Sequence, residues 1–155
     1  MLPLARRSFL LSLGILLLMS LSNDSSIEQL SAAEPATAGQ LDVWIGTSQR
    51  KPSEGIYHCT LDTKTGKLSD PQLAAKISGP GFLALHPDGH HLYAVAKLDD
   101  VPSVVSYHVV PGNTSPSLEF DNALPIADGT AAHVAVEPTG RTLLTAQYGG
   151  GSVAA

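Results

Sequence analysis

The sequence contains a single cysteine among its 155 residues, which excludes an internal disulfide and a cysteine-rich metal site. Charged residues are also scarce, at 15%, and the formal net charge is −5. A mildly acidic chain with scattered lysines lacks the basic patch that nucleic-acid binding requires, so we expect no nucleic-acid partner. Cys59 lies in the strand-like segment 55–61, where we predict a small buried apolar residue and not a reactive thiol.

A long hydrophobic run is missing as well. The longest one, Phe9 to Leu21, has 13 residues, whereas a helix that crosses a bilayer needs about 20. Arg6 and Arg7 precede this run, and small-residue cleavage candidates follow it at 31–33 and 36–38. This is the layout of an export signal, with an uncleaved membrane anchor as the alternative reading. We predict a signal peptide and short linker over residues 1–38, no stable membrane span after cleavage, and an exported, periplasmic protein. The arginine pair leaves general secretory and twin-arginine export both open.

Two stretches of the remaining chain are copies of each other. Residues 82–92 align with residues 133–143 at an offset of 51, as the pair Pro87 and Pro138 shows. A period near 50 that consists of short apolar strands and Pro-x-Gly turns is typical of the blades of a β-propeller. We therefore expect an all-β fold with any functional site where repeats meet.

No helical periodicity long enough for a helix occurs after residue 40, and the apolar segments read as short strands. They are predicted at 41–46, 55–61, from 67, at 82–86, 92–96, 104–109, 117–122, 133–136, 142–147 and from 152. Each repeat thus has about four strands, the number in a propeller blade. Residues 39–155 account for little more than two blades, whereas propellers close with four to eight. We expect an incomplete β-propeller domain that forms the N-terminal portion of a longer protein.

Four groups of segments resemble, in this order, the seven-bladed β-propeller lactonases, which include bacterial 6-phosphogluconolactonase and the fungal enzyme that lactonises carboxymuconate. The matching residues are Val43–Thr47, Glu54–Tyr57 with Asp62–Leu68, Phe82–Gly89 with Leu92–Val95, and His133–Arg141 with Tyr148–Val153. The resemblance implies about two of seven four-stranded blades. It also implies a hydrolase that opens a sugar lactone to its acid without a cofactor, for which this chain alone is an inactive portion.

His133 is the candidate catalytic residue. It opens the innermost predicted strand of its blade, and innermost strands converge on the central channel of a propeller. An imidazole changes charge near neutral pH and can take a proton from water. The resembling lactonases also have a histidine before this strand. The alternative is a histidine that caps a strand end, since Phe82 occupies the equivalent place one repeat earlier.

Tyr148, Gly149 and Gly150 are the candidate substrate-binding residues, because they end the strand that neighbours His133. Glycines let a ligand approach the backbone closely, and a phenol can donate a hydrogen bond, although an ordinary turn would also explain them. The three histidines of the turn His86–His91 match no zinc spacing, so we predict solvated side chains and no metal ligand. His58 and His108 lie in strands without a visible partner.

The seven Lys and Arg residues after position 38 lie mostly near predicted turns, and we expect phosphate-binding cations on other blades. An exported lactonase would seldom meet a phosphorylated sugar, which leaves the identity of the lactone open. The alternative to a lactonase is a non-catalytic exported propeller that binds a ligand or a protein. The oligomeric state is not predicted, and a ring closed by several copies is a third possibility.

Overall fold

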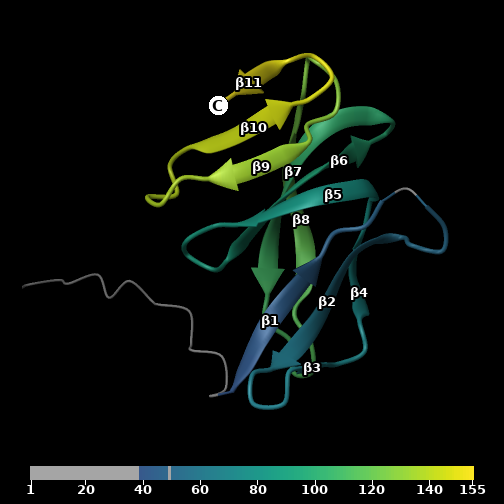
Figure 1. Cartoon of the computed structure of the whole chain (residues 1–155), viewed down its shortest axis with the longest axis vertical. Helices are drawn as coiled ribbons and strands as arrows, with labels where there is room; N and C mark the ends of the chain where they lie inside the picture. The colour runs from purple at the N-terminus through teal and green to yellow at the C-terminus, as the bar shows by residue number, and fades with distance from the viewer. Residues whose placement is uncertain (1–38, 49) are drawn as a thin grey trace, which may run out of the picture. The chain divides into compact units, whose positions relative to one another are not determined.

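The computed structural model describes residues 39–48 and 50–155, and every regular element in these ranges is a β-strand. Three antiparallel sheets follow one another along the chain (Figure 1). The all-β prediction is thereby confirmed. The described ranges include no helix of the length and hydrophobicity that crossing a bilayer requires. The predicted signal peptide and linker, residues 1–38, lie outside the described residues.

The first sheet consists of β1 (Gln40–Ile45), β2 (Gly55–Asp62), β3 (Lys67–Leu68) and β4 (Gln72–Lys76). β1 pairs with one edge of β2, and β3 and β4 pair with the other edge as two pieces of one outer strand. The sequence pattern predicted β3 but not the separate strand β4. Within the described part of the chain β1 pairs with β2 alone, so its other edge has no partner there.

The second sheet is a complete four-stranded meander of β5 (Ser78–Leu85), β6 (His91–Leu98), β7 (Val101–Val110) and β8 (Ser117–Pro125). The loop that we predicted between β6 and β7 is wrong, because Leu98 and Val101 pair directly. A two-residue turn connects them, in which Asp99 and Asp100 adopt φ of 49° and 65°. Aspartate tolerates this left-handed conformation, so the hairpin forms without the glycine that usually marks such a turn.

The third sheet contains β9 (His133–Val136), β10 (Leu143–Gln147) and β11 (Ser152–Ala154), with β10 in the middle. Its first hairpin repeats that of the second sheet. Gly89 and Gly140 have φ of 74° and 76°, and each donates its N–H over 2.9 Å to the carbonyl three residues earlier. The 51-residue repeat is therefore a repeat of structure, and each copy forms the inner hairpin of one blade.

Apolar side chains pack between successive sheets. The core between the first and second sheets contains Ile56 at 0% exposure, and its other buried members belong to β6, β7 and β8. A smaller cluster of Val95, Ala131 and Val134 joins the second sheet to the third. Cys59 is free and 2% exposed, as predicted. Burial of both faces of a sheet is what stacking of blades around an axis produces.

Glu137 fixes the turn between β9 and β10. Its carboxylate accepts the backbone N–H groups of Thr139 at 2.8 Å and Arg141 at 2.7 Å and the hydroxyl of Thr139. The Thr139 hydroxyl and these backbone donors lower the pKa of Glu137 to about 2. A carboxyl whose pKa is depressed by folding stabilises the fold above its unfolded pKa, and this contribution is lost as the pH falls toward the folded pKa.

We expect Glu137→Ala to lower the melting temperature at pH 7 and to differ less and less from the parent protein between about pH 4.5 and pH 2. Thermal unfolding followed by circular dichroism over this pH range measures the effect. Glu137→Gln is the matched variant, because it keeps an acceptor oxygen but does not titrate. A difference between Glu137→Ala and the parent that stays constant over this range would contradict the assignment.

Candidate functional site

One end of the three sheets gathers the predicted site residues, and we call this end the rim. It is formed by the described residues of the connections at 46–48 and 50–54, 99–100, 126–132 and 148–151, together with β5 as far as Phe82 and the first residue of β9. Within each sheet the connections alternate between two ends because neighbouring strands are antiparallel. In Figure 1 the β1–β2, β6–β7 and β10–β11 connections all lie away from the β5–β6 and β9–β10 turns.

His133 is the first residue of β9 and is exposed. β9 pairs only with β10 among the described strands, so its other edge faces the centre around which the blades would stack. The His133 ring lies 5.4 Å from the ring of Phe82, with an angle of 56° between the planes. Phe82 holds the equivalent position in the preceding blade and is 47% exposed. The rim therefore presents an imidazole beside an apolar ring where the sequence predicted His133 to lie.

Tyr148 is 90% exposed and follows β10 directly. Open space surrounds the position where a side chain on Gly149 would lie, so a ligand can reach the backbone there. Gly150 is different, since a Cβ atom on it would lie 2.0 Å from Oδ2 of Asp128. The Asp128 carboxylate, which belongs to the β8–β9 connection, occupies the space that a side chain at position 150 would need. The two glycines thus differ in their surroundings, and the roles predicted for Gly149 and Gly150 in substrate binding stay predictions.

Gln147 holds the start of this loop in place. Its side chain is 2% exposed, donates from Nε2 to Oγ1 of Thr145 at 2.7 Å and accepts a bond from the hydroxyl of Ser152 at 3.3 Å. Its backbone carbonyl accepts the N–H of Gly151 at 2.9 Å. Sequence reasoning passed over Gln147 and Asp128. A polar residue within an otherwise apolar strand was the available signal for Gln147, whereas the place of Asp128 depends on a contact between loops.

Cationic side chains also lie on the rim. Arg50 and Lys51 are exposed in the β1–β2 connection, and Lys97 lies close to the end of β6. Topology brings these side chains to the end that carries His133, where they can attract an anionic ligand or product. The expectation that phosphate-binding cations belong to other blades stays a prediction.

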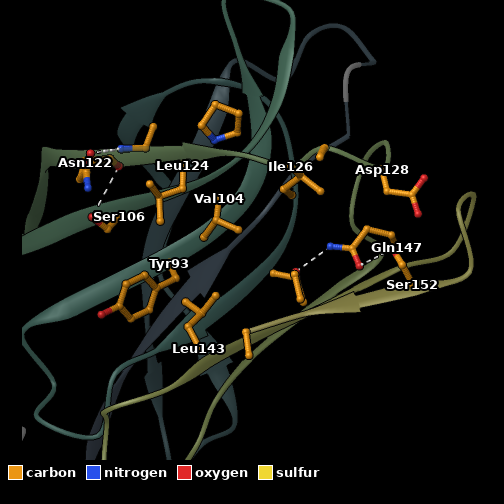
Figure 2. Close-up of a pocket in the computed structure, with 16 residues that line it drawn as sticks. Tyr93, Val104, Ser106, Asn122, Leu124, Ile126, Asp128, Leu143, Gln147 and Ser152 are labelled. Carbon is orange, nitrogen blue, oxygen red and sulfur yellow. Dashed lines mark hydrogen bonds between the residues drawn. The ribbon is translucent and has the colours of Figure 1, made fainter.

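A cavity of about 550 Å³ lies between the second and third sheets, but it is separate from the His133 ring. Figure 2 shows its mostly apolar walls, with Tyr93, Val104 and Leu124 on one side and Leu143 on the other. Neither His133 nor Tyr148 is among its lining residues. Its apolar walls belong to the faces of two successive sheets, so we interpret the cavity as part of the packing between blades.

His58 has partners that the sequence did not indicate. Its imidazole is 2% exposed and lies 2.7 Å from Oδ1 of Asp42 and 2.8 Å from Oγ of Ser115. Because a carboxylate only accepts, Nε2 carries the proton toward Asp42, and in the neutral ring Nδ1 accepts from the Ser115 hydroxyl. The order hydroxyl, imidazole, carboxylate is that of a hydrolytic triad. Here the buried ring connects β1, β2 and the β7–β8 loop, which is a structural role.

The turn between β5 and β6 brings two imidazoles to one carboxylate. Nδ1 of His86 lies 2.9 Å from Oδ1 of Asp88, and Nδ1 of His91 lies 3.0 Å from Oδ2. Partial burial alone would raise the pKa of Asp88, but hydrogen bonds from the backbone N–H of His90 and from both imidazoles hold it at about 2. The prediction that these histidines are merely solvated does not describe His86, whose side chain is 19% exposed.

A family model described as "Lactonase, 7-bladed beta-propeller" matches residues 42–155. The chain is 36% identical over 110 residues to 6-phosphogluconolactonase of Bacillus subtilis (strain 168), an alignment that covers 71% of this chain and 31% of the relative. A candidate 6-phosphogluconolactonase from Bacteroides uniformis ATCC 8492 has a similar structure, with a TM-score of 0.65 and 29% identity over 74% of this chain and 32% of that one. The periplasmic gluconolactonase of Pseudomonas aeruginosa gives a TM-score of 0.62 and 25% identity, covering 70% and 31% of the two chains.

Proposed function

Since the chain belongs to the seven-bladed β-propeller lactonase family, we propose that the protein hydrolyses a sugar lactone to its open-chain acid at the rim. The chain spans about a third of the length of the relatives that it matches. The activity is therefore proposed for the protein with the family's full set of blades. We propose in addition that the 155 residues alone are inactive, because they supply only some of the blades that would enclose the site.

The observation that carries this proposal is the exposed imidazole of His133 on an innermost strand, 5.4 Å from the ring of Phe82. The imidazole takes a proton from water while the water oxygen attacks the carbonyl carbon of the lactone. The resulting oxyanion needs hydrogen-bond donors, and we assign this role to the Tyr148 hydroxyl and the backbone N–H of Gly149 on the same rim. Cleavage of the ring C–O bond returns the proton to the leaving oxygen and gives the hydroxy acid.

We propose an unphosphorylated sugar lactone as the physiological substrate. The relatives support both possibilities, since one is named a 6-phosphogluconolactonase and another a periplasmic gluconolactonase. The predicted export signal favours the second, because phosphorylated sugars are cytosolic metabolites. The same signal and the same relative support a periplasmic location, which fractionation of expressing cells tests.

The test of substrate is proton release from glucono-δ-lactone and from its 6-phosphate, measured in a pH-stat with the full-length protein and with residues 39–155 alone. We expect a higher kcat/KM for the unphosphorylated lactone and turnover by the full-length protein only. A preference for the phosphate ester would overturn the substrate but keep the lactonase. Absence of turnover with either lactone would instead favour the alternative, an exported propeller that only binds its ligand.

A further inference from the structure

We propose that the turn between β5 and β6 binds a divalent transition-metal ion, with Zn²⁺ as the reference ion, through His86, Asp88 and His91. Each of these residues offers one ligand atom, and the three atoms lie within 4.8 Å of one another. Two imidazole nitrogens and one carboxylate form a donor set that suits zinc and its first-row neighbours better than Mg²⁺ or Ca²⁺. Within the described ranges, no other group of three such side chains comes as close together.

The ligand atoms need to move only a little to share an ion. Zinc binds imidazole nitrogen and carboxylate oxygen at about 2.0–2.2 Å in a tetrahedral arrangement, so two such ligands lie about 3.4 Å apart. The two nitrogen–oxygen distances in the turn are 2.9 and 3.0 Å. The ring centroids of His86 and His91 are 5.7 Å apart, the rings are nearly perpendicular, and each Nδ1 atom lies within 3.0 Å of a different oxygen of Asp88.

The other ring nitrogen of His86 is held by the next blade. Its Nε2 lies 3.0 Å from the carbonyl oxygen of Gly140, and because a carbonyl only accepts, Nε2 carries a proton. Its Nδ1 lies 2.9 Å from Oδ1 of Asp88, where a cation between the nitrogen and the carboxylate would satisfy both atoms. Metal-binding histidines commonly donate their second N–H to a backbone carbonyl in this way.

The second copy of the hairpin shows that the turn does not need histidine at these positions. His86, Asp88 and His91 correspond to Glu137, Thr139 and Thr142 at the offset of 51. The backbone closes in the same way, with the same glycine conformation and the same pair of hydrogen bonds, 86 with 91 and 137 with 142, at 2.9 and 3.0 Å. In the second turn the Glu137 carboxylate accepts the backbone N–H groups, so the turn closes there without an imidazole.

The proposed ion lies away from the rim. His86 follows Phe82 by four residues, which is about 13 Å along a strand. The ion is therefore not an actor in lactone hydrolysis, and this proposal does not depend on the proposed function. Its structural effect follows from the bond between His86 and Gly140, which joins the inner turns of two successive blades. An ion on Nδ1 polarises the Nε2–H group and should strengthen this link.

The experiment is equilibrium dialysis of the full-length protein, purified without a histidine tag, against ZnCl₂ at pH 7.5, with bound zinc measured by mass spectrometry. His91→Thr takes its new side chain from the second turn, and Asp88→Asn keeps an oxygen that can accept the N–H of His90. We expect each variant to bind zinc at least 10-fold more weakly at this site. The control is His90→Arg, which replaces a histidine that is not a proposed ligand by the residue at the same place in the second turn. This variant should bind zinc as the parent protein does.

Circular dichroism of each variant shows whether the fold is kept, and a rise in the parent's melting temperature with ZnCl₂ that His91→Thr lacks would be independent support. MgCl₂ in excess should not displace the zinc. Equal binding by the parent, His91→Thr and Asp88→Asn would assign the zinc to adventitious sites and overturn the proposal. No binding to the parent would overturn it too, since a proton on His86 would then account for the contact with Asp88.

Discussion

Replacing His133 by alanine should lower kcat for lactone hydrolysis by about 10²- to 10⁴-fold, the contribution that a positioned general base makes. The methyl group cannot take a proton from water, while β9 keeps its pairing with β10 because that pairing is made by backbone groups. The binding of the lactone should change little, so the loss should appear in kcat more than in KM. Steady-state rates of the full-length protein in a pH-stat measure both constants.

Two further variants make the result specific. His108→Ala removes an exposed imidazole from β7 and should leave kcat within about 2-fold, because surface substitutions rarely disturb distant sites. Tyr148→Phe removes one proposed donor to the oxyanion and should lower kcat by about 10²- to 10³-fold, because that hydrogen bond acts in the transition state. If His133→Ala and His108→Ala both retain the kcat of the parent protein, the His133 imidazole has no part in the chemistry.

The repeat predicted the architecture well, because alternation of apolar strands with Pro-x-Gly turns is local information. The predicted strand ends lie within two residues of the observed ones in both inner hairpins, except that β5 begins four residues before the predicted strand. The errors occurred where the signal is weak. Asp99 and Asp100 form a tight turn without glycine. The strand β4 has only five residues, which pair with β2.

Only those features of the candidate site that depend on a single strand could be predicted from the sequence. The position of His133 follows from its place at the start of an innermost strand. The contact between Asp128 and Gly150 could not be read from the sequence, because it joins two loops whose paths depend on the packed sheets. The same holds for His58 and Ser115, which are 57 residues apart. The proposed metal ligands are close in sequence, but their convergence depends on ring orientations that no spacing rule contains.

The core between the first two sheets should dominate stability, and Ile56→Ala is its most direct test. Ile56 is 0% exposed on β2 and packs in the core cluster whose other buried members lie on the second sheet. Removal of the larger part of a buried isoleucine side chain leaves a cavity, and such changes cost about 2–5 kcal/mol. This is a large share of the roughly 5–15 kcal/mol that holds a typical domain together, so partial unfolding is expected under mild conditions.

Urea unfolding measures this loss, with the fluorescence of Trp44 as a local probe, since it is the single tryptophan of the 155 residues and packs against the same cluster. Ile56→Val should cost only about 0.5–1.5 kcal/mol, because it removes one methylene and keeps the branched shape. Leu41→Ala is the matched surface change on β1, where the side chain is 51% exposed, and it should cost less than Ile56→Ala. An Ile56→Ala midpoint as high as that of Leu41→Ala would mean that packing between the first and second sheets contributes little to the stability of the fold.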